Sequence, residues 1–362
     1  MPNAQIMMSG YSLLAALLLS LLICTNARPI GQWLKVMDIP DTGRKRHAVP
    51  TPLVGGLAII IPFITCVFFQ LYEGQLSDPA LFVAIAVCGS GVALIGFIDD
   101  QTPTSPAARV LFLLVFYGAA LILDPALITK ALHWGSFTAT AIPPVGFIIL
   151  LGMTAVGFVN AVNMADGQNG IVLGMFLIWS VCFALVPDSS IQFAAVALAA
   201  LSLLVLGFNL AGKLFLGDCG TYGVTFVFGL MAAAAHAHQT VRLETIVVWF
   251  FIPIADCIRL LIARTLQRRS PFVGDRDHFH HRLEDKLGRR LGLVAYLSAV
   301  GASSLIATLR PQFGLFAFVA LSAFYFSFAR ITDGPGVAVE DESAPTGRVD
   351  GTVIPLKRDR GE

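Results

Sequence analysis

Charged residues are scarce in this chain of 362 residues, because Asp, Glu, Lys and Arg make up 13% of it, against 56% hydrophobic residues. The mean hydropathy of +0.77 is too high for a soluble globular domain of this length. The net charge of +1 is uninformative about partners, and we expect no nucleic-acid partner. The composition therefore predicts an all-α, polytopic integral membrane protein.

The chain also has few cysteines, and none of the six forms a pair with the spacing of a zinc ribbon or a redox motif. We expect five of them within or at the ends of membrane spans and Cys219 in a loop, all as free thiols. No loop is long enough to fold alone as a soluble domain. No sequence repeat is visible, which argues mildly against transporters built from inverted repeats.

Apolar runs long enough to cross a bilayer follow one another along the chain, and we expect about eleven transmembrane helices. The first run has no basic flank before it and no convincing cleavage site, so we expect a retained anchor. Residues 1–330 form the expected transmembrane domain, and the polar tail at 331–362 is expected to be disordered. The runs lie near residues 6–24, 53–72, 80–98, 107–128, 142–159, 171–187, 191–210, 220–238, 243–264, 291–308 and 312–329.

The distribution of basic residues predicts the orientation of these helices. With the amino terminus outside, only Lys130, Arg242 and Arg310 of the 24 Lys and Arg residues fall on the outer side. Every concentration of polar residues then falls on the inner side, which favours a membrane-embedded enzyme working at the cytoplasmic face. These clusters are GRKRH at 43–47, Asp99-Asp100, NAVNMADGQNG at 160–170, GDCG at 217–220 and DRDHFHHRL at 275–283.

Asp99 and Asp100 end an apolar run, with Pro103 just beyond. Two adjacent carboxylates repel each other and are costly beside lipid, so a compensating cation or metal is expected. The alternative is a solvated helix end, although helix carboxyl termini favour cations over paired acids.

The segment at 160–170 places Asn160, Asn163, Asp166 and Asn169 at intervals of three. On a helix this spacing keeps neighbours on one face, and an amide-rich cluster with one carboxylate suits hydrogen bonding to a ligand and oxygen coordination of a metal. A turn that ends a helix is the alternative.

The GDCG segment carries Asp218 between glycines that allow a ligand to approach closely. Asp218 is a candidate Mg²⁺ ligand at the entrance of the following helix, and simple helix capping is the alternative.

The segment at 275–283 offers as many as five donors to an anion and suits a diphosphate better than a single phosphate. A zinc site and a solvated basic loop are the alternatives, and no nearby Cys or suitably spaced carboxylate completes a zinc site convincingly. The donors are Arg276, His278, His280, His281 and Arg282.

Lys45 and His47 belong to the first inner loop, where an arriving lipid phosphate would meet cations first. Orientation of the chain in the membrane is the alternative explanation for these charges.

Taken in order, these motifs resemble those of the polyprenyl-phosphate N-acetylhexosamine-1-phosphate transferases, glycosyltransferase family 4. The resemblance covers roughly residues 38–283 and implies ten or eleven transmembrane helices. It also implies transfer of a sugar 1-phosphate, most commonly of GlcNAc, from a UDP-sugar to undecaprenyl phosphate, with release of UMP. The motifs are DxPDxxRKxHxxPxPxxGG, DD, NxxNMxDGxxG, GDxG and HxHHRL.

The resemblance also implies roles for single residues. Asp218 and Asn163 would bind Mg²⁺, with Mn²⁺ as an alternative, and Asp99 and Asp100 would deprotonate or position the lipid phosphate. Asp166 and Asn169 match positions near the nucleotide, and the donors at 276–282 would grip the diphosphate. The enzyme would lie in the bacterial inner membrane, begin a cell-envelope polysaccharide such as O-antigen or exopolysaccharide, and form a homodimer.

The chain departs from the family pattern at two places. Asn169 stands where most bacterial relatives carry a second Asp, and Gln168 stands where an apolar residue is common. These changes put the nucleotide contacts in doubt. The segment after Asp100 lacks the usual charged residue, although Arg109 offers a basic group nearby.

Two other functions compete with the transferase. A secondary transporter would carry ionisable residues near the bilayer midplane, and we expect essentially none at the span centres. A catalytically inactive relative acting as a scaffold is the other, which retention of the paired acids and Asp218 disfavours. A direct transfer and a two-step route through a covalent Asp intermediate both remain open.

Overall fold

The computed structural model describes residues 2–40, 49–128, 132–134, 137–139, 143–268 and 277–329, together with the short strands at 347–349 and 352–354. Helices dominate these residues. The longer helices are α1 (Pro2–Thr25), α3 (Gly55–Tyr72), α5 (Ser90–Gln101), α6 (Pro106–Leu123), α7 (Pro144–Ala165), α8 (Ile171–Leu185), α9 (Ser189–Leu210), α10 (Gly217–Ala237), α11 (Leu243–Leu266), α13 (Arg289–Leu309) and α14 (Gly314–Phe328).

Shorter helices and two antiparallel strand pairs connect them, and a third strand pair follows α14. Met37 pairs with Pro52 where β1 meets β2, and this pair ties α2 to the start of α3. The shorter elements are α2 (Ala27–Leu34), α4 (Pro79–Ala84), η1 (Ile85–Gly89), η2 (Pro125–Leu127), α12 (Phe279–Leu287), η3 (Pro311–Phe313), β1 (Met37–Asp38), β2 (Thr51–Pro52), β3 (Leu132–Trp134), β4 (Phe137–Ala139), β5 (Gly347–Val349) and β6 (Thr352–Ile354).

Every expected span coincides with a helix, but fewer of them meet the requirements for crossing a membrane. In the described part of the chain nine helices are long and apolar enough, or ten if α1 and α2, which meet at a bend of 74°, count as one span. The expected sixth span is α8, whose 15 residues fall short of the roughly 20 that a bilayer requires. The chain is a multi-pass, all-α membrane protein.

Local sequence explains where several helices begin. Asp78 and Ser105 stand at the starts of α4 and α6, and their side chains accept hydrogen bonds from the backbone amides of Leu81 and Ala108 at 3.2 Å each. A proline follows each cap, at the position where a helix needs no amide donor. Asp78 thus fixes where the helical segment that contains α5 begins, and Ser105 fixes where the following helix, α6, begins.

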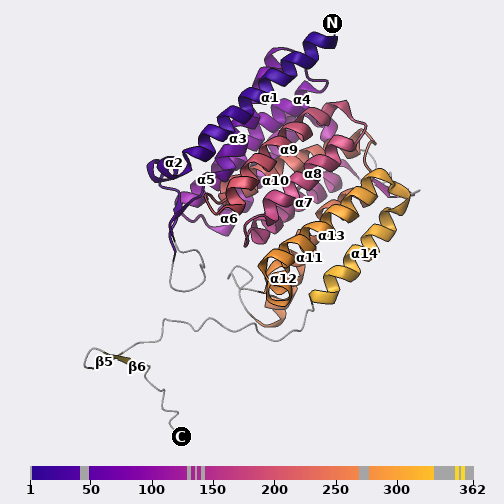
Figure 1. Cartoon of the computed structure of the whole chain (residues 1–362). Helices are drawn as coiled ribbons and strands as arrows, with labels where there is room; N and C mark the ends of the chain where they lie inside the picture. The colour runs from indigo at the N-terminus through magenta and orange to yellow at the C-terminus, as the bar shows by residue number, and fades with distance from the viewer. Residues whose placement is uncertain are drawn as a thin grey trace.

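The helices lie side by side in one bundle, with α1 and α14 on opposite flanks (Figure 1). α10 is the central helix, because 89% of its apolar window is buried, against 22% for α6 and for α14. The successive reversals of the chain bring the ends of α5 and α7 and the start of α10 to one end of the bundle, which we call the site end. The other end, where α3 and α10 finish, is called the opposite end.

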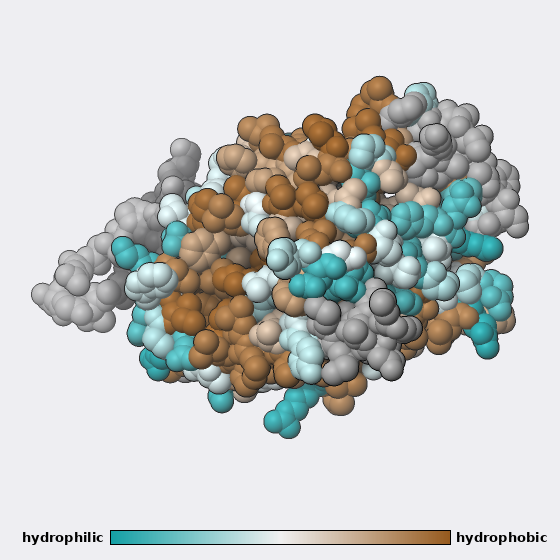
Figure 2. Space-filling view, turned by 90° about the horizontal axis from the view of Figure 1, so that it is seen from above, coloured by the Kyte–Doolittle hydropathy of each residue, from teal (hydrophilic) through white to brown (hydrophobic). Residues whose placement is uncertain are grey.

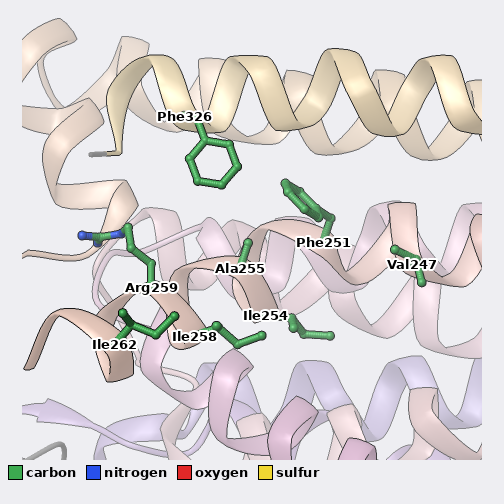
Figure 3. A pocket seen from close by; sticks show the side chains of 8 residues that line it. All are labelled: Val247, Phe251, Ile254, Ala255, Ile258, Arg259, Ile262 and Phe326. Carbon is green, nitrogen blue, oxygen red and sulfur yellow. The ribbon is translucent and has the colours of Figure 1, made fainter. Parts of the chain in front are cut away.

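Apolar side chains cover much of the outer surface, as broad hydrophobic areas show on the face seen in Figure 2. On α6, for example, Leu111, Val115 and Ile122 are exposed to 60%, 55% and 80%. Such a surface suits lipid rather than water. A cavity of about 360 Å³ opens between α11 and α14, where Phe251 and Phe326 face it together with the carbon chain of Arg259 (Figure 3).

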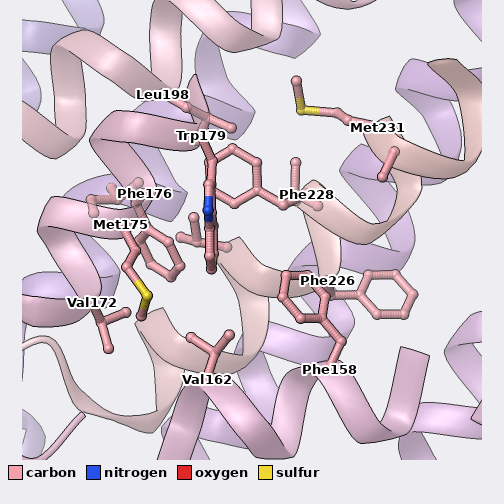
Figure 4. Close-up of a cluster of buried hydrophobic side chains, with 14 of the residues drawn as sticks. Phe158, Val162, Val172, Met175, Phe176, Trp179, Leu198, Phe226, Phe228 and Met231 are labelled. Atoms are coloured by element: carbon pink, nitrogen blue, oxygen red, sulfur yellow. The ribbon is translucent and has the colours of Figure 1, made fainter. Parts of the chain in front are cut away.

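Aromatic rings fill the interior between α7, α8 and α10 (Figure 4), and Phe250 of α11 packs against Phe158 and Trp179 of this group. The ring of Trp179 lies 5.7 Å from those of both Phe158 and Phe228 and 6.1 Å from that of Phe176. Its indole N–H donates to the Trp249 carbonyl at 2.8 Å, so the one polar atom of this side chain is satisfied. This core explains why α8, although short, is buried along most of its length.

Candidate active site

Asp99 lies at the site end of α5, where its carboxylate is buried and surrounded by donors. Oδ1 accepts from the amide and the hydroxyl of Thr104, at 2.6 and 2.8 Å. Oδ2 accepts from the Tyr222 hydroxyl at 2.8 Å and lies 3.4 Å from Arg109 Nη1. Arg109 therefore supplies the basic group that the sequence segment after the paired acids lacks, and it is anchored to Tyr222 by a hydrogen bond of 3.1 Å.

Asp100 points instead to the first turn of α10. Its two carboxylate oxygens accept from the amides of Asp218 and Cys219 at 2.8 and 3.0 Å. The acid thus caps an end at which free amide groups and the helix dipole favour negative charge. Gly217 makes this approach possible, since its φ is +75° and a Cβ there would lie 2.8 Å from the Asp100 carboxylate.

The GDCG segment is not a loop, contrary to the expectation for Cys219, which is buried in the first turn of α10. All six cysteines are buried free thiols. Glycines around this turn serve helix packing: a Cβ on Gly56 of α3 would collide with Gly220, and one on Gly96 of α5 would collide with the Asp218 backbone. Three helices thus meet closely enough to hold Asp218 and the paired acids together.

Asn163, near the end of α7, reaches the same point. Its Nδ2 donates to Asp218 Oδ1 at 2.6 Å and to the Thr221 hydroxyl at 3.2 Å. Asn160, one turn earlier, donates to the Val156 carbonyl of its own helix. Of these two asparagines, only Asn163 contacts another motif.

The three carboxylates of Asp99, Asp100 and Asp218 lie close enough to repel one another, with Arg109 as the neighbouring cation. Such a cluster suits a divalent cation. No group of three or more His, Cys, Asp or Glu side chains within the described ranges is arranged to hold a metal alone. Mg²⁺ commonly takes one or two protein oxygens and completes its shell with phosphate and water, so Asp218 with the amide oxygen of a reoriented Asn163 fits this ion.

The loop from α7 to α8 is fastened by the residues that depart from the family pattern. Gln168 Nε2 donates to the Arg289 carbonyl at 3.1 Å, and Asn169 Nδ2 donates to the Asn209 carbonyl at 2.9 Å. The Asn209 side chain in turn accepts from the Gly170 amide at 2.8 Å. Asn209 was missed at the sequence level, because a single amide near a helix end has no distinctive pattern. The side chain of Asp166 is exposed beside these fixed residues.

Several of the expected anion donors in the segment at 275–283 already face carboxylates of this protein. Arg282 Nε donates to Asp277 Oδ1 at 2.9 Å, and His281 Nδ1 lies 3.4 Å from Glu284 Oε2. His278 Nδ1 lies 3.2 Å from Asp256 Oδ2. Each of these donors therefore has a carboxylate partner that the count of donors in the sequence left out.

His280 connects this segment to the rest of the site. A Cβ on Gly167 would collide with the His280 ring, so the imidazole lies directly against the loop that carries Asp166. Asp166 is in turn near enough to Asp218 for their charges to interact. The structure thus brings four of the five motifs together in one strip, made up of Asp99-Asp100 and the segments at 160–170, 217–220 and 277–283. Lys45, His47 and Arg276 lie outside the described residues.

Two ionisable residues, Asp256 and Arg259, lie within the expected span at 243–264, in the second half of α11. Cys257 beside them contacts Met164 near the end of α7, so the pair lies at the level of the site end. Arg259 Nη2 donates to Asp256 Oδ1 at 2.9 Å. Two opposite charges three positions apart in an apolar run are a signal that the sequence does carry. Both side chains are buried, and they contact α12 and α14 rather than an open path across the membrane.

Comparison with known proteins bears on this arrangement. A family model described as glycosyl transferase family 4 matches residues 82–236, which include Asp99, Asp100, Asn163 and Asp218. Over this segment the chain is similar to glycosyl transferase family 4, and the relatives below support that similarity. The similarity supports a membrane-embedded transferase.

Similar family members come from several bacteria. Undecaprenyl-phosphate alpha-N-acetylglucosaminyl 1-phosphate transferase of Yersinia pestis is 27% identical over 268 residues, 70% of this chain and 71% of that protein. Its counterpart in Escherichia coli K12 is 25% identical over 282 residues, 74% of each chain. Decaprenyl-phosphate N-acetylglucosaminephosphotransferase of Mycobacterium tuberculosis is 27% identical over 313 residues, 73% of this chain and 74% of that protein.

Proposed function

We propose that this protein is a member of glycosyl transferase family 4 and transfers a sugar 1-phosphate from a UDP-sugar to undecaprenyl phosphate. GlcNAc-1-phosphate is the proposed group, because the similar proteins above carry this sugar in their names. The products are UMP and a lipid diphosphate sugar that begins a cell-envelope polysaccharide. The observation that carries the proposal is the meeting of Asp99, Asp100, Asn163 and Asp218 at one end of the bundle.

The reaction needs an in-line displacement at phosphorus. An oxygen of the lipid phosphate attacks the phosphorus that bears the sugar, and the bond from that phosphorus to the bridging oxygen breaks, so that UMP leaves with the bond's electrons. Phosphoryl transfer of this kind depends mainly on positioning and on neutralising charge. Mg²⁺ held by Asp218 and Asn163 would neutralise charge on the diphosphate, and Mn²⁺ is the alternative ion.

Asp99 and Asp100 divide the remaining work in this proposal. Asp99 is held by Tyr222 and Arg109 and is suited to position the lipid phosphate or take its proton. Asp100 keeps Asp218 in place through the first turn of α10. Their fixed orientation avoids the cost of reorganising charge during the reaction.

The substrate contacts follow the strip described above. Asn160, Asp166 and Asn169 are proposed to face the nucleotide side, and His278, His280, His281, Arg276 and Arg282 to face the diphosphate. Lys45 and His47 are proposed to meet the lipid phosphate. A site at the head-group level lets the lipid phosphate react while its chain stays in the bilayer. We place it at the cytoplasmic face of the bacterial inner membrane, in a homodimer.

The test is an assay of the purified protein with undecaprenyl phosphate, Mg²⁺ and a panel of UDP-sugars, following UMP and the lipid-linked product together. We expect equal amounts of both products with one donor, and loss of both in EDTA with recovery on adding Mg²⁺. Absence of product with every donor, from folded protein that binds undecaprenyl phosphate, would contradict the proposal. Substrate-driven uptake into proteoliposomes would establish a transporter instead.

A further inference from the structure

A buried carboxylate has no role in the mechanism given above, although it contacts residues 277–283, which we call the histidine segment. Asp256 lies in α11, and five donors converge on it. Oδ1 accepts from Arg259 Nε at 3.2 Å, from Arg259 Nη2 at 2.9 Å and from the Tyr325 hydroxyl at 3.1 Å. Oδ2 accepts from the Phe279 amide at 3.1 Å and faces His278 Nδ1 at 3.2 Å.

These contacts fix the proton on one nitrogen of His278. An ionised carboxylate can only accept hydrogen bonds, so the His278 nitrogen that faces Asp256 must carry a hydrogen. The remaining ring nitrogen, Nε2, is then the one that can meet a substrate. A carboxylate that selects the tautomer of a functional imidazole is a recurring arrangement in enzymes.

Asp256 also fixes where the histidine segment begins. Its bond to the Phe279 amide caps the first turn of α12, and Arg259 extends the anchor by donating to Asp277 Oδ2 at 3.2 Å and to the Asp277 carbonyl. The carbon chain of Arg259 lies along the cavity between α11 and α14, while its charged end turns away from it (Figure 3). The histidine segment is therefore anchored to α11.

We propose that Asp256 is a positioning residue for the transfer reaction, acting through His278. It holds the imidazole with Nδ1–H toward α11, so that Nε2 is directed to the diphosphate of the nucleotide sugar. This inference rests on the proposed function for the identity of the substrate. The tautomer that it assigns to His278 does not depend on that substrate.

The opposite end of the molecule contains a matched pair for comparison. Asp188, at the start of α9, accepts from the Ser190 amide at 3.0 Å and faces His238 Nδ1, also at 3.0 Å. It too is a buried aspartate that caps a helix and holds a histidine. Asp188→Asn therefore makes nearly the same chemical change as Asp256→Asn, away from the proposed site.

The experiment compares these two variants of the full-length protein in detergent. Asp256→Asn is expected to lower kcat at least tenfold with little change in KM for undecaprenyl phosphate, and Asp188→Asn is expected to stay within about twofold of the unchanged protein. His278→Gln should lower kcat by a similar factor, and the double variant Asp256→Asn/His278→Gln should be no slower than the slower single variant. Equal losses in Asp256→Asn and Asp188→Asn, or additive losses in the double variant, would overturn the proposal.

A second measurement needs no turnover. Nitrogen-15 spectra of labelled histidine, assigned by the signal that disappears in His278→Gln, should show a hydrogen on Nδ1 of His278 in the unchanged protein. A bare Nδ1 would overturn the inference even if the enzyme is active. A protonated Nδ1 in a protein without transferase activity would instead sustain the tautomer and reject only the proposed reaction.

Discussion

Both ends of the bundle hold a buried Asp–His pair, but their surroundings differ. At the site end Asp256 shares its charge with Arg259, and hydroxyl and amide donors surround it. At the opposite end the imidazole of His238 lies 3.0 Å from the Asp188 carboxylate and 3.7 Å from that of Asp78. At the site end the aspartate–histidine pair is thus part of a larger hydrogen-bond network. At the opposite end the histidine lies between two acids.

The buried carboxylate of Asp188 nevertheless has several hydrogen-bond donors. Burial by itself would raise the pKa of Asp188, but hydrogen bonds from Ser190, His238 and Thr240 outweigh it and hold this pKa below its usual range. The stability that Asp188 contributes is therefore present above its unfolded pKa and is lost as the pH falls through the lower folded value. What separates the two ends is that the donors to Asp188 lie at the start of α9 and just after α10, whereas those of Asp256 join α11, α12 and α14.

The largest contrast is expected from removing the carboxylate at the start of α10. Asp218→Asn should lower transferase activity by about 100-fold or more, because it removes a charged ligand of the proposed cation. Asp188→Asn at the opposite end should leave activity within about twofold. Initial rates of UMP release at saturating Mg²⁺ measure both, and full activity of Asp218→Asn would reject the metal assignment.

The next contrast concerns the free energy of unfolding, and it compares a buried ion pair with a half-exposed one. Arg259→Met leaves Asp256 buried without its main cation and should cost about 3–5 kcal/mol of unfolding free energy. Arg242→Met at the opposite end breaks a pair with Glu244 whose nearest atoms are 3.8 Å apart, and it should cost less than about 1 kcal/mol. Unfolding in mixed micelles with increasing SDS compares them, and equal costs would remove the distinction between the two ends.

The next contrast concerns packing, and it compares a crowded glycine at the site end with an open one toward the opposite end. Gly167→Ala should displace the His280 ring, cost about 1–3 kcal/mol and slow the reaction, because the added methyl group has no space. Gly118→Ala, in the half of α6 toward the opposite end, meets nothing within 4 Å and should stabilise the helix by about 0.5–1 kcal/mol. Thermal unfolding and initial rates of both variants decide this, and an unimpaired Gly167→Ala enzyme would show that His280 is not held there.

The smallest effects are expected from two side-chain amides that donate to backbone carbonyls. Asn169→Asp and Gln192→Glu each lose a donor, to the carbonyls of Asn209 and Val186 respectively, and each should cost about 1 kcal/mol. Activity should fall only in Asn169→Asp, since this loop adjoins the acidic cluster. Higher activity in Asn169→Asp would mean that a carboxylate at this position serves the nucleotide side better than the amide and its bond to Asn209.

Much of this arrangement could be predicted from the sequence. The apolar runs located all eleven helices, because a helix of sufficient length and apolarity is a local property, although α8 proved shorter than a span. Alternation of these runs placed Asp99, Asn163 and Asp218 at one end of the bundle, since each chain reversal returns the next loop to the same end. The contacts among them needed the structure, because residues such as Asp100 and Asp218 lie 118 positions apart.

The sequence by itself determined the membrane class, the helices and the set of polar motifs, because each depends on hydrophobic length or on neighbouring residues. Only the tertiary structure decided what the motifs contact. Asp100 caps α10, Gly56 and Gly96 let three helices approach, and Asp256 holds His278 from within the apolar helix α11. These relations depend on close packing and on the need to satisfy buried polar groups, and neither follows from a periodic pattern along the chain.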